Sequence, residues 1–356
     1  MKKVLTYRSM PFAAEETFMF TVESFCNSVW GTSYAKVLSN VSKDGYKEFQ
    51  IPKKGGMRTI SCLETGAPLG RLQRCLLNNF LERQDIPVCV KGFRKGESYR
   101  SFLYEHIGSR FFLRLDIADF FPSITAEWIK NELSGLLVCD SNEGKDDLLN
   151  LIADIVTLED KLPQGACTSP AVSNLVMARI DQRITKYCQA FHMRYTRYAD
   201  DLLFSSDDFC YSEKKWFIRK MKYILRSKGL ALNYSKIKFG EGEFALNGYI
   251  ISDRGIRLSR NRLSDIKHTV AFVRDNHDLI DRCGVEAFLV DVNKLPLKYR
   301  NLRTYPFKTV FQLLQYLCGY RAFLISMMDD MYAQTSFQKE LLRLIYKIEA
   351  QIILLT

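Results

Sequence analysis

The sequence predicts an α+β protein with a small antiparallel sheet and a helical C-terminal part. Short runs rich in aromatic and β-branched residues, bounded by Gly, Pro, Asn or Asp, are typical of β-strands. Longer stretches with apolar residues at helical spacing are typical of amphipathic helices. Strand-like runs occur between residues 46 and 259, and helical spacing dominates after Leu258. This order of elements is characteristic of the α+β class.

The N-terminal third is expected to contain two helices and one hairpin. Residues 14–50 predict a helix followed by a loop. Residues 46–63 predict two strands joined by a basic, Gly-rich turn at Lys53–Gly56. Residues 67–83 carry apolar side chains at helical spacing and predict a second helix.

The middle of the chain is expected to add one strand and one long helix. Residues 110–121 predict a strand that ends near the first acid of this run. Residues 139–147 form the most loop-like stretch of the chain. Residues 162–187 predict a Gly-containing turn and then a long helix, capped by Thr168 or Ser169.

Three further elements complete the prediction. Residues 194–206 predict a hairpin with two acids at its tip. Residues 213–228 predict a basic helix, and residues 244–259 predict a hairpin that turns at Asp253–Gly255. The remaining residues are expected to be helical.

Charge favours a polyanionic partner. The chain has 51 Lys and Arg against 40 Asp and Glu, a net charge of +11. Residues 211–262 alone carry 13 basic and 4 acidic residues, a net +9, with aromatic residues among them. Basic side chains neutralise phosphates, and exposed aromatic rings stack on bases, although most of these rings are expected in the core.

The ten cysteines are scattered singly, with no C-x-x-C pair. This spacing argues against a zinc site and against a disulfide framework, and it fits a reducing cytoplasm. No run of about 18 apolar residues is present, so no membrane span is expected.

Three aspartates form the candidate site. Asp200 and Asp201 occupy the tip of the hairpin, where the simplest alternative is a solvated turn. Asp116 ends a strand 84 residues earlier. If that strand lies beside the hairpin, three carboxylates converge, and their repulsion at neutral pH calls for divalent cations. Mg²⁺ binds through few carboxylates and keeps positions open for substrate phosphates.

Five segments together resemble the successive motifs of reverse transcriptases. They are "LDIADFFPSI" (115–124), "LPQGACTSP" (162–170), "YADD" (198–201), "GLALNYSKIKF" (229–239) and "LNGYIIS" (246–252). The upstream "KKGGMRTI" and "GFRKGESYRSFLYEHIG" resemble the fingers of bacterial retron-type enzymes. The resemblance implies a right-hand polymerase fold, with fingers over residues 1–110, a palm over 111–262 that includes part of the fingers at 125–165, and a helical thumb over 263–356.

The resemblance also implies roles for individual residues. Asp116, Asp200 and Asp201 resemble the catalytic, metal-binding acids, which hold two Mg²⁺ ions, with Mn²⁺ as an alternative. The dNTP-binding residues implied are Arg58, Phe121, Gln164 and Lys236, and the primer grip is Asn247 with Gly248. Phe121 resembles a steric gate against ribonucleotides, although it could be a core residue like Phe120. Lys236 could instead contact a backbone phosphate, and Lys54 is a weaker candidate for triphosphate binding.

Two segments differ from the retron pattern. Phe102 and Leu103 stand where retron enzymes carry Asn and Ala before a histidine, which remains here as His106. Leu246-Asn247-Gly248 replaces Val-Thr-Gly. These differences favour the related defence-associated reverse transcriptases slightly over the retron enzymes.

The resemblance implies an RNA-directed DNA polymerase that copies a dedicated non-coding RNA, in anti-phage defence. Its expected partners are the RNA template or primer, the DNA product and RNA–DNA duplex, dNTPs, and an effector protein or further copies of the chain. Two alternatives stay open: a weakly templated or protein-primed DNA polymerase, and an RNA-binding scaffold with an inactive core. The intact aspartates argue against the scaffold, and Phe121 argues against an RNA polymerase.

Overall fold

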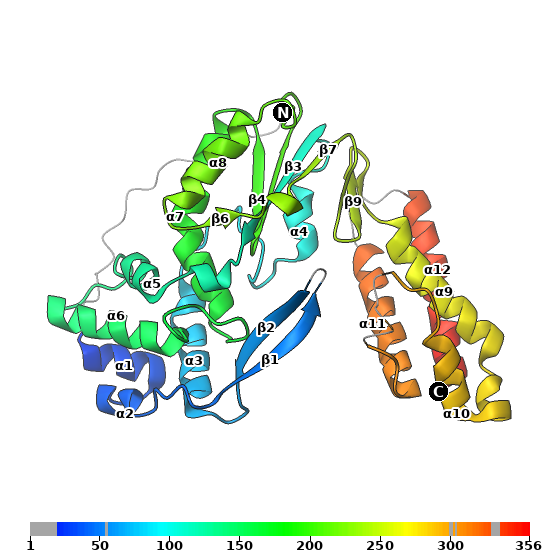
Figure 1. Cartoon of the computed structure of the whole chain (residues 1–356), viewed down its shortest axis with the longest axis horizontal. Helices are drawn as coiled ribbons and strands as arrows, with labels where there is room; N and C mark the ends of the chain where they lie inside the picture. Colours follow the sequence, from blue (N-terminus) through cyan, green and yellow to red (C-terminus); the bar gives the residue numbers. More distant parts are fainter. Residues whose placement is uncertain (1–19, 54–55, 299–301, 303–304, 329–334) are drawn as a thin grey trace.

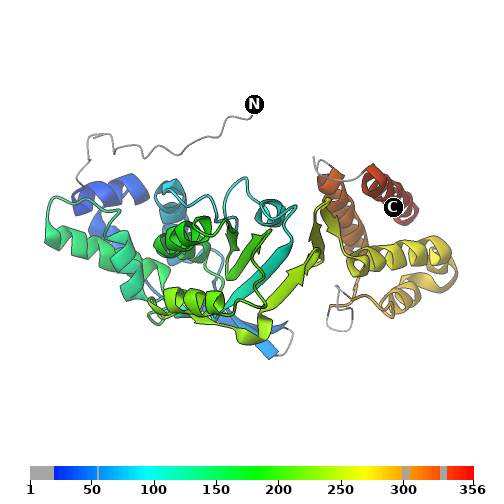
Figure 2. The same cartoon turned by 90° about the horizontal axis from the view of Figure 1, so that it is seen from above.

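The computed structural model describes residues 20–53, 56–298, 302, 305–328 and 335–356. The sheets and helices up to residue 258 form one body, and the helices from 260 to 355 gather beside it at one end of the molecule (Figure 1, Figure 2). The predicted helical C-terminal part is therefore confirmed. Lys54, at the centre of the predicted fingers turn, lies outside the described residues.

Helices and strands occur largely where the sequence predicts them. The helices are α1 (Val22–Trp30), α2 (Tyr34–Leu38), α3 (Pro68–Asn79), α4 (Tyr99–Tyr104), α5 (Ala126–Leu133), α6 (Asn142–Val156), α7 (Ser169–Gln189), α8 (Trp216–Arg226), α9 (Arg260–Asn276), α10 (Leu279–Val292), α11 (Val310–Met328) and α12 (Thr335–Leu355), with short 3₁₀ turns at η1 (Leu81–Arg83), η2 (Phe121–Ser123) and η3 (Tyr234–Lys236). The strands are β1 (Tyr46–Lys53), β2 (Gly56–Leu63), β3 (Phe111–Ala118), β4 (Arg194–Tyr198), β5 (Asp201–Ser206), β6 (Ala231–Leu232), β7 (Lys238–Glu241), β8 (Phe244–Leu246), β9 (Tyr249–Ser252) and β10 (Gly255–Leu258).

The central sheet is antiparallel and built around β3. Its strand order is β4-β5-β3-β6, and β7 also pairs with β3. In the register of β3 with β5, Asp116 lies opposite Asp201. The predicted neighbourhood of the strand and the hairpin is therefore confirmed.

Side chains alternate between two faces of this sheet. The front face carries Asp116 and Asp201, and it also carries Phe112 and Leu203, which pack with the β8–β10 sheet and the helices α9 to α12. The rear face carries residues such as Phe204, which belong to the core formed with α7 and α8. The two faces thus belong to two different hydrophobic cores.

Two segments differ from the prediction. Residues 142–147 are the start of α6 rather than a loop, because Ser141 caps the helix by accepting a hydrogen bond from Gly144 N at 3.1 Å. The predicted hairpin 244–259 is a three-stranded sheet, since a second turn at Asn247–Gly248 separates β8 from β9. Asn247 (φ 47°) and Gly248 (φ 83°) both adopt the left-handed conformation that this turn requires.

A fully buried ion pair fastens the β4–β5 hairpin to α7 behind it. Arg197 on β4 contacts both carboxylate oxygens of Asp181 on α7, at 2.8 to 3.0 Å. Tyr195 donates a hydrogen bond to the same carboxylate at 2.8 Å. Arg197 Nη1 also donates to the carbonyl of Ala199, at 3.1 Å. The pair therefore anchors the backbone of the hairpin tip from the rear face.

Removing one member of this pair should destabilise the protein strongly. We expect Arg197→Met to lower the free energy of unfolding by about 3–5 kcal/mol, because it leaves Asp181 charged and buried. Arg110→Gln is the control, since the Arg110–Glu241 pair is exposed and worth less than about 1 kcal/mol. Urea unfolding of both variants measures the difference, and equal effects would contradict this account.

The buried side chain of His106 forms a second set of hydrogen bonds that hold the hairpin in place. Its Nε2 lies 2.8 Å from Thr196 Oγ1 and its Nδ1 lies 2.7 Å from Ser205 Oγ. Thr196 donates its own proton to the carbonyl of Phe102 at 2.8 Å, so Nε2 must be the protonated nitrogen. Burial, and then the charge of Arg194, lower the His106 pKa from 6.5 to about 3. His106 is therefore a neutral, structural histidine.

This histidine should make stability depend on pH. The unfolded state binds a proton near pH 6.5 and the folded state only near pH 3, so stability is lost as the pH falls through this window. Between pH 6 and 5 the free energy of unfolding of wild type should fall by about 1.4 kcal/mol per pH unit relative to His106→Gln. Parallel denaturant titrations of the two proteins test this, and parallel pH profiles would refute it.

Candidate functional site

The three predicted acids meet at one end of the central sheet. Asp116 lies near the end of β3, Asp201 begins β5, and Asp200 lies in the turn between β4 and β5. Ile117 N donates a hydrogen bond to the Asp200 carbonyl at 3.0 Å, which holds the turn against β3. Backbone pairing, rather than side-chain contacts, therefore brings these residues together.

The turn itself is closely packed from behind. Ala199 has a φ of 55° and is buried. Gly92 approaches it so closely that an added Cβ would lie 2.7 Å from the Ala199 nitrogen. Lys91 N donates to the Arg197 carbonyl at 2.8 Å, which fixes the same loop to the strand. The position of the acids is thus set by a loop far away in sequence.

Two basic side chains contact the acids. Lys236 Nζ lies 2.9 and 3.0 Å from the two carboxylate oxygens of Asp116. Arg114 donates to Asp201 at 2.8 Å through Nε and to Asp116 at 3.3 Å through Nη2. Lys236 thus contacts an acid of the site, and its predicted role in dNTP binding stays a prediction.

Burial works against ionisation of the hairpin acids. It raises the pKa of Asp200, with Asp116 as the next cause. It also raises the pKa of Asp201 to about 6, although the charge and hydrogen bonds of Arg114 oppose this shift. Carboxylates crowded in a poorly solvated place carry unfavourable charge, which added positive charge relieves.

The donor chemistry of this end of the sheet fits a hard divalent cation. Asp116, Asp200 and Asp201 offer carboxylate oxygens, the ligands that Mg²⁺ prefers. In the part of the chain that the structure describes, no three His, Cys, Asp or Glu side chains form a ready-made metal cluster. Arg114 and Lys236 occupy carboxylate oxygens in this arrangement, so these bonds would have to rearrange when a metal binds.

Aromatic rings cluster beside the hairpin that carries the acids. Phe120 is a core residue, as predicted, whereas Phe121 is only partly buried. The ring of Phe93 lies 6.3 Å from that of Phe121 and 6.0 Å from that of Tyr198. Phe93 is 46% exposed and has a φ of 58°, which is unusual for a bulky residue and marks a constrained position.

The two remaining nucleotide-binding candidates lie on connected elements. The Gln164 carbonyl accepts a hydrogen bond from Ser61 N at 2.7 Å, which ties the turn before α7 to β2. An added Cβ at Gly165 would meet the Ser61 carbonyl at 2.7 Å, so the two backbones are in direct contact. Arg58 lies on the same strand β2 and is exposed. No bond joins Arg58 to the aspartates among the described residues.

The predicted primer grip is linked to the hairpin through Tyr99. Asn247 Nδ2 donates to the Tyr99 hydroxyl at 2.8 Å. The Tyr99 ring lies 5.1 Å from that of Tyr198, which directly precedes the turn with the acids. The Gly248 carbonyl accepts a hydrogen bond from Ser259 N at 2.8 Å. The Asn247–Gly248 turn therefore lies between the hairpin and the start of α9.

The structure adds residues that sequence reasoning did not select. The sequence could have predicted that Arg114 lies near the acids. It is two positions before Asp116 in the same strand, so the two side chains share one face of the sheet. Arg197, Phe93 and Tyr99 act through partners far away in sequence, which no local pattern reveals. Asp119, a fourth acid near the end of β3, is exposed. All ten cysteines lie in described segments and are free thiols, and none of the described helices is long and apolar enough to span a bilayer.

Several known proteins similar to this chain are bacterial retron reverse transcriptases. The retron Ec86 reverse transcriptase of Escherichia coli is 30% identical over 269 residues, covering 73% of this chain and 80% of that protein. The retron Mx65 reverse transcriptase of Myxococcus xanthus is 32% identical over 176 residues, or 46% of this chain and 41% of its own length. The retron Se72 reverse transcriptase of Salmonella heidelberg is 24% identical over 255 residues, covering 67% and 66%.

The family match covers the same elements that build the site. The family described as "Reverse transcriptase (RNA-dependent DNA polymerase)" matches residues 51–251. This range begins in the β1–β2 hairpin and ends in β9, and it contains all three aspartates. The chain belongs to the reverse transcriptase family and is a retron-type bacterial reverse transcriptase, an RNA-directed DNA polymerase.

Proposed function

We propose that this reverse transcriptase copies a dedicated non-coding RNA into DNA by two-metal nucleotidyl transfer at Asp116, Asp200 and Asp201. The observation that carries this proposal is the register of β3 with β5, which sets Asp116 opposite Asp201 beside the turn with Asp200. In the reaction the primer 3′-hydroxyl loses its proton and attacks the α-phosphate of a dNTP. A new P–O bond forms, and the bond to pyrophosphate breaks.

The chain's own residues prepare this step. Two Mg²⁺ ions held by the three aspartates would activate the hydroxyl and stabilise the charge on the leaving group. Arg114 and Lys236 hold Asp201 and Asp116 in place through direct bonds, and their positive charges favour the ionised carboxylates. Lys236 is also close enough to this site to serve as the proton donor to the departing pyrophosphate, as its motif suggests.

Substrate selection is proposed to depend on Phe121 and the aromatic ring beside it. Phe121 would lie beneath the sugar of the incoming nucleotide and exclude a 2′-hydroxyl. Phe93 packs against Phe121 and would fix its position. Arg58 on the exposed β2 strand would bind the triphosphate, because a guanidinium pairs well with phosphate oxygens. Gln164, in the turn tied to the same strand, would contact the nucleotide and template.

The chain has the right-hand polymerase fold of its family. We assign the fingers to residues 1–110 with 125–165, the rest of the palm to residues within 111–262, and the thumb to 263–356. Asn247 and Gly248 would hold the primer end, because their turn lies between the catalytic hairpin and the first thumb helix.

The biological setting is proposed from the relatives' names and the composition. Retron reverse transcriptases are among the similar proteins, and we place this enzyme among the retron or related defence-associated enzymes, acting in the cytoplasm against phage. The test is to purify the protein from its native host and sequence the nucleic acid that accompanies it. A discrete RNA with its complementary DNA supports the proposal. Repetitive DNA unrelated to the bound RNA would favour weakly templated synthesis instead.

Replacing both hairpin acids should abolish synthesis without loss of folding. Asp200→Asn combined with Asp201→Asn removes the charges that would bind the metal ions, and the amides keep nearly the same shape. Primer extension on an RNA template measures incorporation, and RNA binding with circular dichroism controls for folding. Nucleotide incorporation by a pure preparation of this folded double variant would refute the proposed metal site.

Phe121→Ala should relax discrimination between dNTPs and rNTPs. Loss of the ring opens space for a 2′-hydroxyl, so kcat/KM for rNTPs should rise relative to that for dNTPs. Phe191→Ala, which removes an exposed ring on the rear side, is the matched control and should leave the ratio unchanged. If Phe121→Ala keeps the wild-type ratio, the gate is another residue.

A further inference from the structure

The outer face of α8 is an unusual basic stripe. The helix contains four basic residues and no acid in the sequence WFIRKMKYILR. Arg219, Lys222, Tyr223 and Arg226 are exposed and follow each other at helical spacing, so they share one side. Buried residues such as Phe217 and Met221 occupy the opposite side. We call this stripe, with Arg183 and Lys220 at its border, the rear basic surface.

The cations of this surface are not neutralised by the protein. Within the described segments, no carboxylate forms an ion pair with any of its five basic residues. Nearby Lys228 differs, because it pairs with Glu132 at 2.8 Å. Unpaired cations at close range repel each other, and a polyanion relieves this repulsion.

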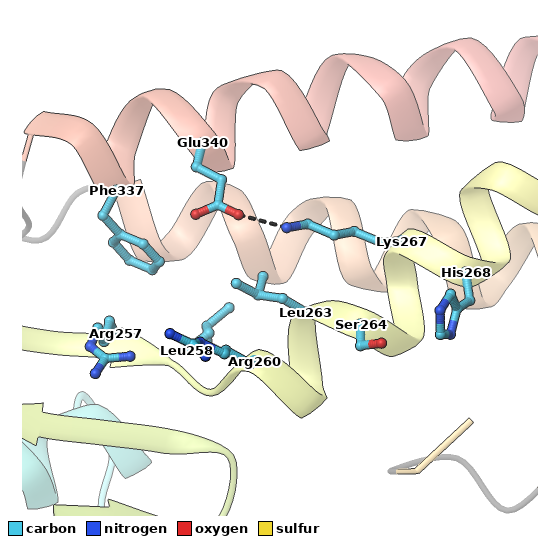
Figure 3. Close-up of a pocket in the computed structure, with 9 residues that line it drawn as sticks. All are labelled: Arg257, Leu258, Arg260, Leu263, Ser264, Lys267, His268, Phe337 and Glu340. Carbon is cyan, nitrogen blue, oxygen red and sulfur yellow. Dashed lines mark hydrogen bonds and ion pairs between the residues drawn. The ribbon is translucent and has the colours of Figure 1, made fainter. Parts of the chain in front are cut away.

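The hollow between β10, α9 and α12 offers a contrast (Figure 3). It is also rich in basic residues, but Lys267 lies 2.6 Å from Glu340 across the hollow. At its rim, Arg257 is paired with Glu243 at 2.8 Å. Lys267 and Arg257 are therefore neutralised within the protein, whereas the cations of the stripe on α8 are not.

Aromatic rings on the rear basic surface are exposed among its cations. Tyr223 is 64% exposed, and Arg183 and Lys220 lie 5.9 and 5.6 Å from the centre of its ring. Tyr234, 57% exposed, has Lys222 at 5.5 Å. Exposed rings interleaved with cations can stack on bases while the cations bind phosphates, which is the chemistry of single-stranded nucleic-acid binding.

This surface lies on the other side of the sheet from the acids. Asp116 and its partner Asp201 point to the front face. Phe204, three residues after Asp201 on β5, points to the rear and packs edge-on against Phe217 of α8 at 5.2 Å. The exposed side of α8 faces away from the sheet, beyond this contact. The exposed side of α8 and the side chains of Asp116 and Asp201 therefore lie on opposite faces of the central sheet.

We propose that the rear basic surface binds a single-stranded RNA segment outside the copied region. The inference rests on the RNA-copying function proposed above, because the RNA that supplies the template also supplies the flanking segment. Phosphates would contact Arg219, Lys222 and Arg226, and a base would stack on Tyr223. The surface would thus hold one part of the RNA on the enzyme while another part of the same RNA passes through the active site.

The test compares two RNA ligands. One is a short primer–template duplex confined to the front of the palm, and the other is the same duplex with a single-stranded RNA tail. Wild type should bind the tailed RNA more tightly. The triple variant Arg219→Gln/Lys222→Gln/Arg226→Gln should bind the tailed RNA no more tightly than the untailed duplex. For the tailed RNA, its slope of log K against log[salt] should be shallower than that of wild type by roughly 2, about 0.7 for each lost phosphate contact. Tyr223→Ala should weaken tail binding at least about fivefold.

Controls separate this proposal from the proposed function. Arg282→Gln with Lys294→Gln removes exposed cations that are paired with acids at the two ends of α10, and it should change tail binding little. Nucleotide incorporation on the untailed duplex should be equal in all of these variants and in wild type. If wild type incorporates no nucleotide, the result contradicts the polymerase function and not the RNA-binding surface. If the triple variant gains as much affinity from the RNA tail as wild type does, the rear basic surface does not bind RNA. If the triple variant loses more affinity for a duplex with a DNA tail than for one with an RNA tail, the assignment of this surface to RNA is wrong.

Discussion

The antiparallel pairing of β3 with β5 is the constraint on which the rest of the structure depends. It sets two aspartates opposite each other and a third in the adjoining turn, in a place where burial raises the pKa of Asp200 and Asp201. Such crowding costs free energy unless positive charge compensates it. Arg114 and Lys236 supply that charge from within the same sheet and the following 3₁₀ turn.

The hairpin withstands this repulsion because it is fastened on both faces. Behind it, the buried pair of Arg197 and Asp181 holds the strand to α7 and reaches the Ala199 carbonyl. In front, His106 joins Thr196 and Ser205 without carrying a charge itself. Fixed acids bind metal ions with less loss of freedom than mobile ones, so this rigidity favours a catalytic arrangement.

Much of the fold and the acids could be predicted from the sequence, because both depend on local patterns and on motifs. The strand, the hairpin and the three aspartates fall where alternation and turn residues place them. The start of α6 was predicted as a loop because its first turn is polar, although Ser141 caps it. Gly92, Arg197 and Tyr99 could not be assigned in advance, since each acts on the hairpin through a contact across many residues of chain.

The division of the sheet between two cores has a mechanical consequence. Phe112 lies on β3 two residues before Arg114, and its ring is stacked on that of Phe244 at 5.3 Å, with an angle of 10° between the planes. Phe244 belongs to the β8–β10 sheet, which shares its core with the thumb helices. A rotation of the thumb must slide this ring pair or carry β3 with it. The strand that carries Asp116 is therefore mechanically coupled to the β8–β10 sheet, which shares its core with the helices after residue 260.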